Sequence, residues 1–131
     1  MGMNIEWEKV KEFHKLFNHP FSESPTMIDS DMAKKRYNWM REEIDEFLSA
    51  TDIVGQADAM IDLIYFALGS LVIMGVKPEK LFDIVHTANM TKVGDGGKPI
   101  YKPDGKIKKP DSWKDPHLLI KKAIEDMKNE V

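Results

Sequence analysis

Residues 59–74 read AMIDLIYFALGSLVIM and contain a single charged residue, Asp62, among sixteen positions. Folded as a helix, this stretch presents apolar side chains on every face, which is typical of a helix enclosed by other helices. We expect the helix to begin near Asp52 and to end at Gly75, because glycine readily takes the left-handed conformation that ends many helices. The stretch therefore predicts an all-α fold built around this helix.

Amphipathic patterns on either side predict the other helices. We expect them over residues 4–18, from Ser30 as the capping residue to about residue 51, from about 78 to 90, and from about 116 to 129. Residues 93–114 are rich in glycine, proline and lysine and predict an irregular loop with a short hairpin around 103–105. The chain, 1–131, is thus expected to be one all-α domain, a helical bundle of about four to five helices completed by dimerisation.

The composition excludes several classes of protein. The chain has 19 lysine and arginine residues against 22 acidic ones, and a net charge of −3 does not indicate binding to nucleic acid or to a membrane surface. It has no cysteine, which excludes disulfides, a thiolate nucleophile and a cysteine-based zinc site. No signal peptide is visible, and the apolar stretch is shorter than the ~20 residues that span a bilayer. We therefore expect a soluble, cytoplasmic protein.

Asp62 is the strongest chemical signal in the chain. A buried, unpaired carboxylate is costly, so a metal ion, a basic side chain or a raised pKa must compensate for it. Asp58 lies one helical turn earlier and faces the same way. On the preceding helix, Glu42, Glu43 and Glu46 flank the apolar stripe. Because the connection between the two helices is short, they should pack antiparallel and bring the five carboxylates together.

Converging carboxylates need cations, and an oxygen-only set suits Mg²⁺ or Mn²⁺. Because Mg²⁺ usually completes its shell with water and substrate phosphates, the pattern favours phosphoryl chemistry. Two plainer interpretations stay open: the glutamates form a solvated helix face, and Asp62 pairs with a lysine of a neighbouring helix. A di-iron bundle is a weak alternative, since it needs Glu-x-x-His on two helices and the chain offers only Asp83 to His86.

Several motifs resemble those of the all-α nucleoside triphosphate pyrophosphohydrolases, which include MazG-like proteins, phosphoribosyl-ATP pyrophosphohydrolases and dimeric dUTPases. The resemblance lies in the acidic segments 42–46 and 57–65, the sequence ANMTK at 88–92, the segments 95–100 and 104–110, and Trp113. One position departs from the pattern. Many members carry an acid three residues before the one at Asp62, where this chain has Ala59, and its acid is Asp58 instead.

The resemblance implies hydrolysis between the α- and β-phosphates of a nucleotide, which releases a nucleoside monophosphate and pyrophosphate. It implies a homodimer or a dimer of dimers that uses Mg²⁺, with Mn²⁺ as a substitute. Glu43, Glu46 and Asp62 would be the principal metal ligands. Glu42 and Asp58 would bind a second ion or orient the attacking water. A role in nucleotide-pool housecleaning is compatible with this activity.

Four further residues are candidate substrate contacts, and each has a plainer alternative. Asn89 and Lys92 could bind phosphate, sugar or base, although a lysine at a helix end is commonly solvated. Trp113 stands in a polar segment and either stacks on a base or anchors the tail to the bundle. His14 either lines the base pocket with neighbouring aromatic residues or packs in the core.

Two other functions compete with the enzyme. The chain could be a non-catalytic dimeric helical module that binds a nucleotide or a protein, which the departure at Ala59 leaves open. It could also be an interaction bundle whose acids are only surface charge. A metal site would distinguish the enzyme from the second of these, because a solvated acidic face responds little to divalent ions.

Overall fold

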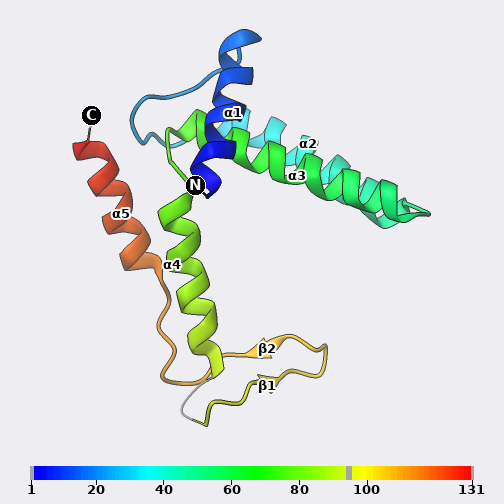
Figure 1. Cartoon of the computed structure of the whole chain (residues 1–131), viewed down its shortest axis with the longest axis vertical. Helices are drawn as coiled ribbons and strands as arrows, with labels where there is room; N and C mark the ends of the chain where they lie inside the picture. The colour runs from blue at the N-terminus through cyan, green and yellow to red at the C-terminus, as the bar shows by residue number, and fades with distance from the viewer. Residues whose placement is uncertain (1, 94–95, 131) are drawn as a thin grey trace.

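The computed structural model describes residues 2–93 and 96–130. Its elements are α1 (Met3–Leu16), α2 (Ser30–Ser49), α3 (Ile53–Met74), α4 (Glu79–Met90), the 3-10 turn η1 (Thr91–Val93), β1 (Ile100–Tyr101), β2 (Ile107–Lys108) and α5 (His117–Asn129) (Figure 1). The predicted all-α class is confirmed, and so is the short hairpin inside the loop. Gly94 and Asp95, which belong to the predicted loop, lie outside the described residues.

The α2 and α3 helices form an antiparallel hairpin and lie side by side along their length (Figure 1). Asp52 caps α3, because its Oδ1 accepts a hydrogen bond of 2.8 Å from the backbone N–H of Gly55. The cap of α2 is Asp29, whose Oδ1 accepts a bond of 2.8 Å from Met32 N. The prediction that Ser30 is this cap was therefore wrong by one residue. Both residue types can accept the bond, so local sequence alone does not choose between them.

Helix α1 packs across α3, and the two helices share the main apolar core. Trp7, Val10, Leu68 and Val72 form its buried cluster. The loop after α1 is tied to the end of α3, since Thr26 N donates to Met74 O at 2.8 Å. Gly75 ends α3 in the left-handed conformation, with φ of 67°, and a Cβ there would lie 2.6 Å from Ser24 O. Glycine is therefore required at this predicted helix end.

Arg36 is a buried cation that joins α2 to α3. Only 4 % of its surface is exposed. Its Nε donates to Ser70 Oγ at 2.7 Å, and its Nη2 donates to Phe66 O at 2.8 Å. The guanidinium carbon also lies 5.7 Å from the ring centre of Trp39 and 5.8 Å from that of Phe66. These contacts compensate part of the cost of burying the charge and fix how the two helices align.

We expect Gly69→Ala to test how firmly Arg36 is held. The added methyl group would lie 2.5 Å from Arg36 Nη2 and 3.0 Å from His14 Nε2. The change should lower the free energy of unfolding by about 1–3 kcal/mol, even though alanine is favoured over glycine in helices by about 1 kcal/mol. Urea denaturation measures the difference. Ala67→Gly, at an exposed site of the same helix, controls for helix propensity. A variant as stable as the wild type would show that the guanidinium moves freely.

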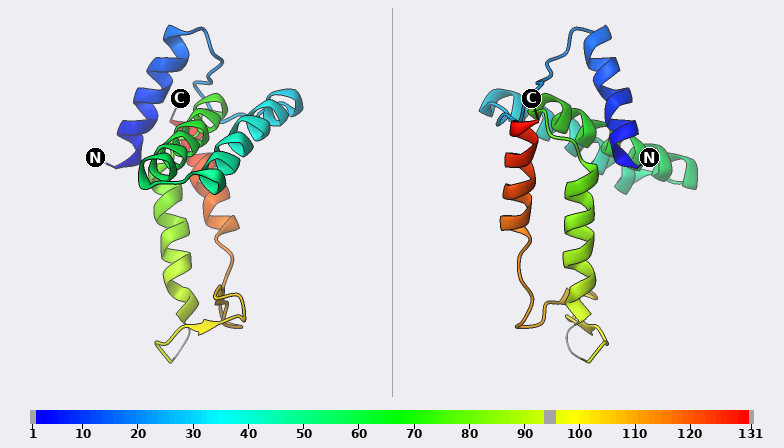
Figure 2. Two further views of the ribbon diagram at one scale, coloured as in Figure 1. Left: turned by 90° about the vertical axis from the view of Figure 1, so that its right-hand side faces the viewer. Right: turned by 60° about the vertical axis from the view of Figure 1, so that its left-hand side comes forward.

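The second half of the chain forms a projecting arm, defined here as α4, η1, the hairpin and α5. Helix α4 leaves the end of α3 and packs along α5, away from α2 and α3 (Figures 1 and 2). The antiparallel strands at the far end of α4 pair Ile100 with Lys108 and Tyr101 with Ile107. The start of α4 is anchored, because Glu79 N donates to Asn4 Oδ1 at 3.0 Å. The arm therefore extends from a fixed corner.

Much apolar surface is left uncovered within one chain. On α3, Ile61 is 62 % exposed and Ile64 is 48 % exposed, so the prediction that other helices enclose α3 does not hold for the single chain. Within residues 2–93 and 96–130, its main packing partners are α1 and α2. Among the described residues, α3 alone is long and apolar enough to cross a membrane. The helix has 22 residues, which is longer than the apolar stretch considered in the sequence. Core helices of soluble proteins can have the same length and apolar composition, so these two properties alone do not identify a membrane span.

Candidate active site

Four acidic residues from two helices lie together on the α2–α3 hairpin. Glu43 and Glu46 come from α2, and Asp58 and Asp62 come from α3. The two glutamates lie shortly before the turn that joins α2 to α3, and the two aspartates lie shortly after it (Figure 1). The antiparallel packing therefore places them at similar height, as the spacing in the sequence predicts. We call Glu43, Glu46, Asp58 and Asp62 the acidic cluster.

The electrostatics of the acidic cluster show that its members act on one another. Burial, a hydrogen bond with Glu46 and the charges of Glu46, Asp62 and Asp58 raise the pKa of Glu43 to about 7. Burial and the charges of Asp58 and Glu46 also raise the pKa of Asp62 above its usual value. Like charges at short range disfavour ionisation of each carboxyl group. The cluster thus carries an unfavourable concentration of negative charge when it is ionised.

No basic side chain of the described residues neutralises the acidic cluster. The ion pairs in residues 2–93 and 96–130 are Lys9 with Glu6 and Lys11 with Glu23, both on other parts of the surface. The alternative in which a lysine pairs with Asp62 therefore finds no support in this part of the chain. In addition, Glu43 Oε2 is buried and has no hydrogen-bond partner. In native proteins such an oxygen is usually paired with a protein group, a water molecule or an ion.

The acidic cluster fits a hard divalent cation by its chemistry. All its donors are carboxylate oxygens, the ligands that Mg²⁺ and Mn²⁺ prefer. In the described part of the chain, no three acidic or histidine side chains already stand in ligating positions around one point. Side-chain rotations on the two helices would therefore have to accompany binding. Mg²⁺ keeps several waters and takes few protein ligands, so one or two of these carboxylates would be enough to hold it.

Glu42 is placed differently from the acidic cluster. It is exposed on α2, and it is not among the charges that act on Glu43 or Asp62. Asp45, on the same helix, is also exposed. Of the five carboxylates selected from the sequence, the structure thus brings four together and leaves Glu42 at the side.

Asn89, Lys92 and Trp113 lie on the arm, at the opposite end of α4 from the corner with α3. Trp113 Nε1 donates to Ala88 O at 2.7 Å, which anchors the segment before α5 to α4. Lys92 Nζ lies 5.5 Å from the Trp113 ring centre, and Lys109 Nζ lies 4.5 Å from it. Asn89 is exposed. The structure therefore groups Lys92 with Trp113 but does not bring either of them to the acidic cluster of the same chain.

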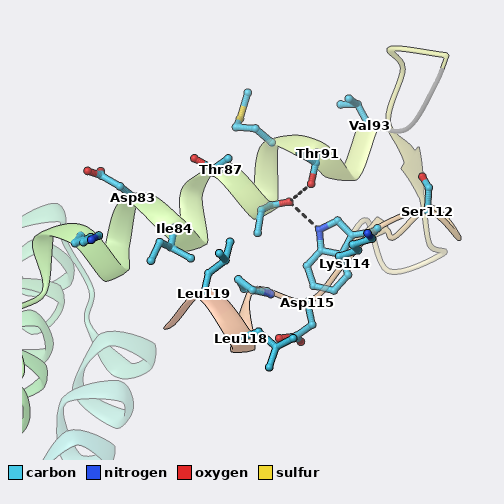
Figure 3. Close-up of a pocket in the computed structure, with 15 residues that line it drawn as sticks. Asp83, Ile84, Thr87, Thr91, Val93, Ser112, Lys114, Asp115, Leu118 and Leu119 are labelled. Atoms are coloured by element: carbon cyan, nitrogen blue, oxygen red, sulfur yellow. Dashed lines mark hydrogen bonds between the residues drawn. The ribbon is translucent and has the colours of Figure 1, made fainter. Parts of the chain in front are cut away.

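A large groove runs beside this group, between α4 and α5. Its volume is about 1060 Å³, and its lining includes Trp113 and the residues that follow it up to Pro116. Lys114 and Asp115 of this segment are labelled in Figure 3. The walls are mainly apolar, with Ile84 from α4 and Leu118 and Leu119 from α5. Lys114 and Asp115 line it near the tryptophan. The hydrogen bond of Trp113 supports its role as an anchor of the tail, while its ring remains only partly buried.

His14 is a core residue in this structure. It is 3 % exposed, and its Nδ1 lies 2.8 Å from Pro20 O, so it holds the loop after α1 in place. Burial, opposed by this hydrogen bond, lowers its pKa, and the charges of Arg36 and His19 lower it further. These contacts favour the packing interpretation of His14 over the substrate contact.

The lowered pKa of His14 predicts an acid-dependent loss of stability. Below pH 6.5 the unfolded chain takes up a proton that the folded chain resists, so the free energy of unfolding should fall as the pH decreases towards the folded pKa. One group contributes at most about 1.4 kcal/mol per pH unit. Glu43 acts in the opposite sense, since its pKa is raised. The measurement is therefore the difference between wild type and His14→Gln in urea denaturation across pH 5 to 8. Parallel curves for the two proteins would contradict the prediction.

Sequence reasoning missed two residues that the structure makes prominent. Arg36 faces α3 on the same side of α2 as Glu43, seven residues away, and this helical spacing could have indicated a buried position. Lys109 lies over the ring of Trp113. The two residues belong to an irregular segment without helical or strand spacing, so no local sequence pattern indicated this contact.

Comparisons with known proteins agree with this architecture. A model of the phosphoribosyl-ATP pyrophosphohydrolase family matches residues 10–89, which include the acidic cluster and end before Lys92. A crystal structure from Exiguobacterium sp. 255-15, described as a candidate NTP pyrophosphohydrolase, is 32 % identical, with 95 % of this chain and 97 % of that chain covered and a TM-score of 0.55. None of the curated proteins matches. Because the family model covers more than half of the sequence, this chain belongs to the phosphoribosyl-ATP pyrophosphohydrolase family.

Proposed function

We propose that this chain is an Mg²⁺-dependent nucleotide pyrophosphohydrolase that cleaves between the α- and β-phosphates, with a role in nucleotide-pool housecleaning. The observation that carries the proposal is the acidic cluster: four carboxylates from α2 and α3, no neutralising side chain in the described residues, and a buried oxygen of Glu43 without a partner. Membership of a pyrophosphohydrolase family supports the type of reaction.

The acidic cluster and the neighbouring Glu42 would have two different roles. Glu43, Glu46 and Asp62 would hold the cation, with Asp58 as a further ligand from α3. A bound Mg²⁺ would supply charge neutralisation for the phosphate oxygens and acidify a water molecule. Glu42 lies beside the cluster and is free to orient the attacking water and accept its proton. The chain offers no cysteine, and no side-chain nucleophile is required.

A homodimer, alone or paired into a dimer of dimers, is part of the proposal. Large apolar side chains such as Ile61 and Ile64 of α3 and Ile44 of α2 are exposed in the single chain. Ile61 and Ile64 are neighbours on one face of α3, because they lie three residues apart in a helix. An exposed apolar face of a helix is typical of a protein–protein interface. A second copy would cover the face of α3 that α1 and α2 leave open.

The test is a panel of canonical and modified nucleotides incubated with Mg²⁺, followed by separate detection of pyrophosphate and orthophosphate. We expect a nucleoside monophosphate and pyrophosphate in equal amounts. Orthophosphate alone would place the cleavage elsewhere and overturn the proposal. Tight nucleotide binding without any product would favour the non-catalytic binding module, which the absence of an acid at Ala59 supports.

A further inference from the structure

Arg36 joins α2 to α3 on the same hairpin that carries the acidic cluster. Glu43 follows Arg36 by seven residues on α2. On α3, Asp62 precedes Ser70, which bonds to Arg36, by eight residues. In an antiparallel pair of helices, nearly equal steps along the two chains lead to the same height. The bond of Arg36 and the meeting of Glu43 with Asp62 therefore belong to one register of α2 against α3.

Arg36 is neither a ligand nor a counter-ion of the acidic cluster. Its position on α2 is two helical turns, about 10 Å, from that of Glu43, and its guanidinium is bonded to α3 beyond Asp62. The charges that act on the pKa of Glu43 and on that of Asp62 come from other acids, and Arg36 is not among them. Any effect of Arg36 on the cluster must therefore pass through the alignment of the two helices.

The hydrogen bonds of Arg36 restrict this alignment more than apolar packing does. Its Nε donates to Ser70 Oγ at 2.7 Å and its Nη2 donates to Phe66 O at 2.8 Å, so one planar group contacts two successive turns of α3. The ridges and grooves of helix surfaces repeat along the axis, whereas these two acceptors occur at one height. Sliding the helices would leave a buried cation without its acceptors, which is costly.

Three helices surround the guanidinium and hold it at this height. Gly69 of α3 leaves room for it, because a Cβ there would lie 2.5 Å from Arg36 Nη2. The same Cβ would lie 3.0 Å from Nε2 of His14, so α1 reaches the same place. The ring of Trp39, on α2, lies beside the guanidinium. The charge is thus enclosed at the point where α1, α2 and α3 meet.

We propose that Arg36 is a positioning residue for the metal site: by fixing the register of α2 against α3, it sets the separation between the glutamates and the aspartates of the acidic cluster. A slide of one residue moves the acids of one helix by about 1.5 Å relative to those of the other. A displacement of about 1 Å is enough to impair a site that depends on precise geometry. This inference rests on the proposed function, in which these acids hold Mg²⁺, and adds a residue outside the cluster on which its geometry depends.

Binding of Mn²⁺ alone, measured by calorimetry on the folded proteins, tests this role. Arg36→Lys keeps the positive charge but cannot contact both acceptors through one planar group. Ser70→Ala removes one acceptor from α3 and leaves the arginine in place. We expect the Kd for Mn²⁺ to rise by about 10- to 100-fold in Arg36→Lys, as it does when residues that orient metal ligands are changed. The rise in Ser70→Ala should be smaller, because the bond to Phe66 remains.

Val72→Ala is the matched control for lost stability. Val72 is 0 % exposed and packs with Trp7 and Val10 of α1, so this change weakens the core without removing a bond between α2 and α3. Urea denaturation measures how much stability each variant has lost. We expect Val72→Ala to bind Mn²⁺ with the Kd of the wild type, even where its loss of stability equals that of Arg36→Lys.

The possible outcomes lead to different conclusions. Equal weakening of Mn²⁺ binding in Val72→Ala and Arg36→Lys would show that Arg36 only stabilises the fold, and would refute the inference. Wild-type affinity in both Arg36→Lys and Ser70→Ala would refute it as well. If Arg36→Lys does not fold, the Kd of Ser70→Ala against that of Val72→Ala decides. A wild-type protein that binds no Mn²⁺ would instead refute the proposed function, and the inference with it.

Discussion

Asp62→Asn is expected to lower turnover by roughly 100-fold or more while the helices remain folded. Asparagine has nearly the same shape as aspartate but lacks its charge, so it is a poor ligand for Mg²⁺. The residue lies on α3 in the middle of the acidic cluster, where burial and the charges of Asp58 and Glu46 raise its pKa. Steady-state measurement of pyrophosphate release determines the loss.

The controls separate lost chemistry from lost structure. Asp45→Asn makes the same change at an exposed site on α2, and its turnover should match that of the wild type. The metal-free Asp62→Asn protein should melt at or above the temperature of the metal-free wild type, because one of several repelling carboxylates has been removed. Unchanged turnover in a folded Asp62→Asn protein would remove Asp62 from the site.

Removal of divalent ions is expected to abolish turnover and to lower the melting temperature. A cation that binds only the folded cluster stabilises it by about 2.7 kcal/mol at a hundred times its Kd, and this corresponds to about 8 °C for a domain of this size. The change in melting temperature should be large, because the acidic cluster has no neutralising side chain among the described residues.

Differential scanning fluorimetry with EDTA, then with Mg²⁺ or Mn²⁺, measures this response. Sodium chloride at equal ionic strength controls for general screening of charge. Asp62→Asn should lose most of the shift, whereas Asp45→Asn should keep it. Equal shifts in all three proteins, or none in the wild type, would show that the carboxylates do not form a metal site.

The helices and their order could be predicted because their signals are local. The end of α3 at Gly75 was predicted correctly. The error at Ser30 has a local cause, since Asp29 beside it is an equally good cap. The register of Glu43 and Glu46 with Asp58 and Asp62 followed from the short turn between two helices.

The enclosure of α3 and the neighbours of Lys92 could not be predicted in the same way. Because α3 is apolar on all faces, its sequence indicates that other helices cover it, but does not indicate whether these helices belong to the same chain. The direction of α4 depends on how Val76 and Pro78 pack at the corner. The pattern that placed Asn89 and Lys92 among the candidate residues contains no information about that direction.

The helices, the family resemblance and the alignment of acids across the α2–α3 hairpin could all be predicted from the amino-acid sequence, because periodicity and a short turn are enforced by hydrogen bonds between near neighbours along the chain. Three features are visible only in the folded chain: His14 is a core residue, Arg36 joins α2 to α3, and the arm carries Lys92 away from the acids. These features arise from contacts between residues far apart in sequence. Their free energies depend on burial and on the whole arrangement of neighbours, which no local pattern encodes.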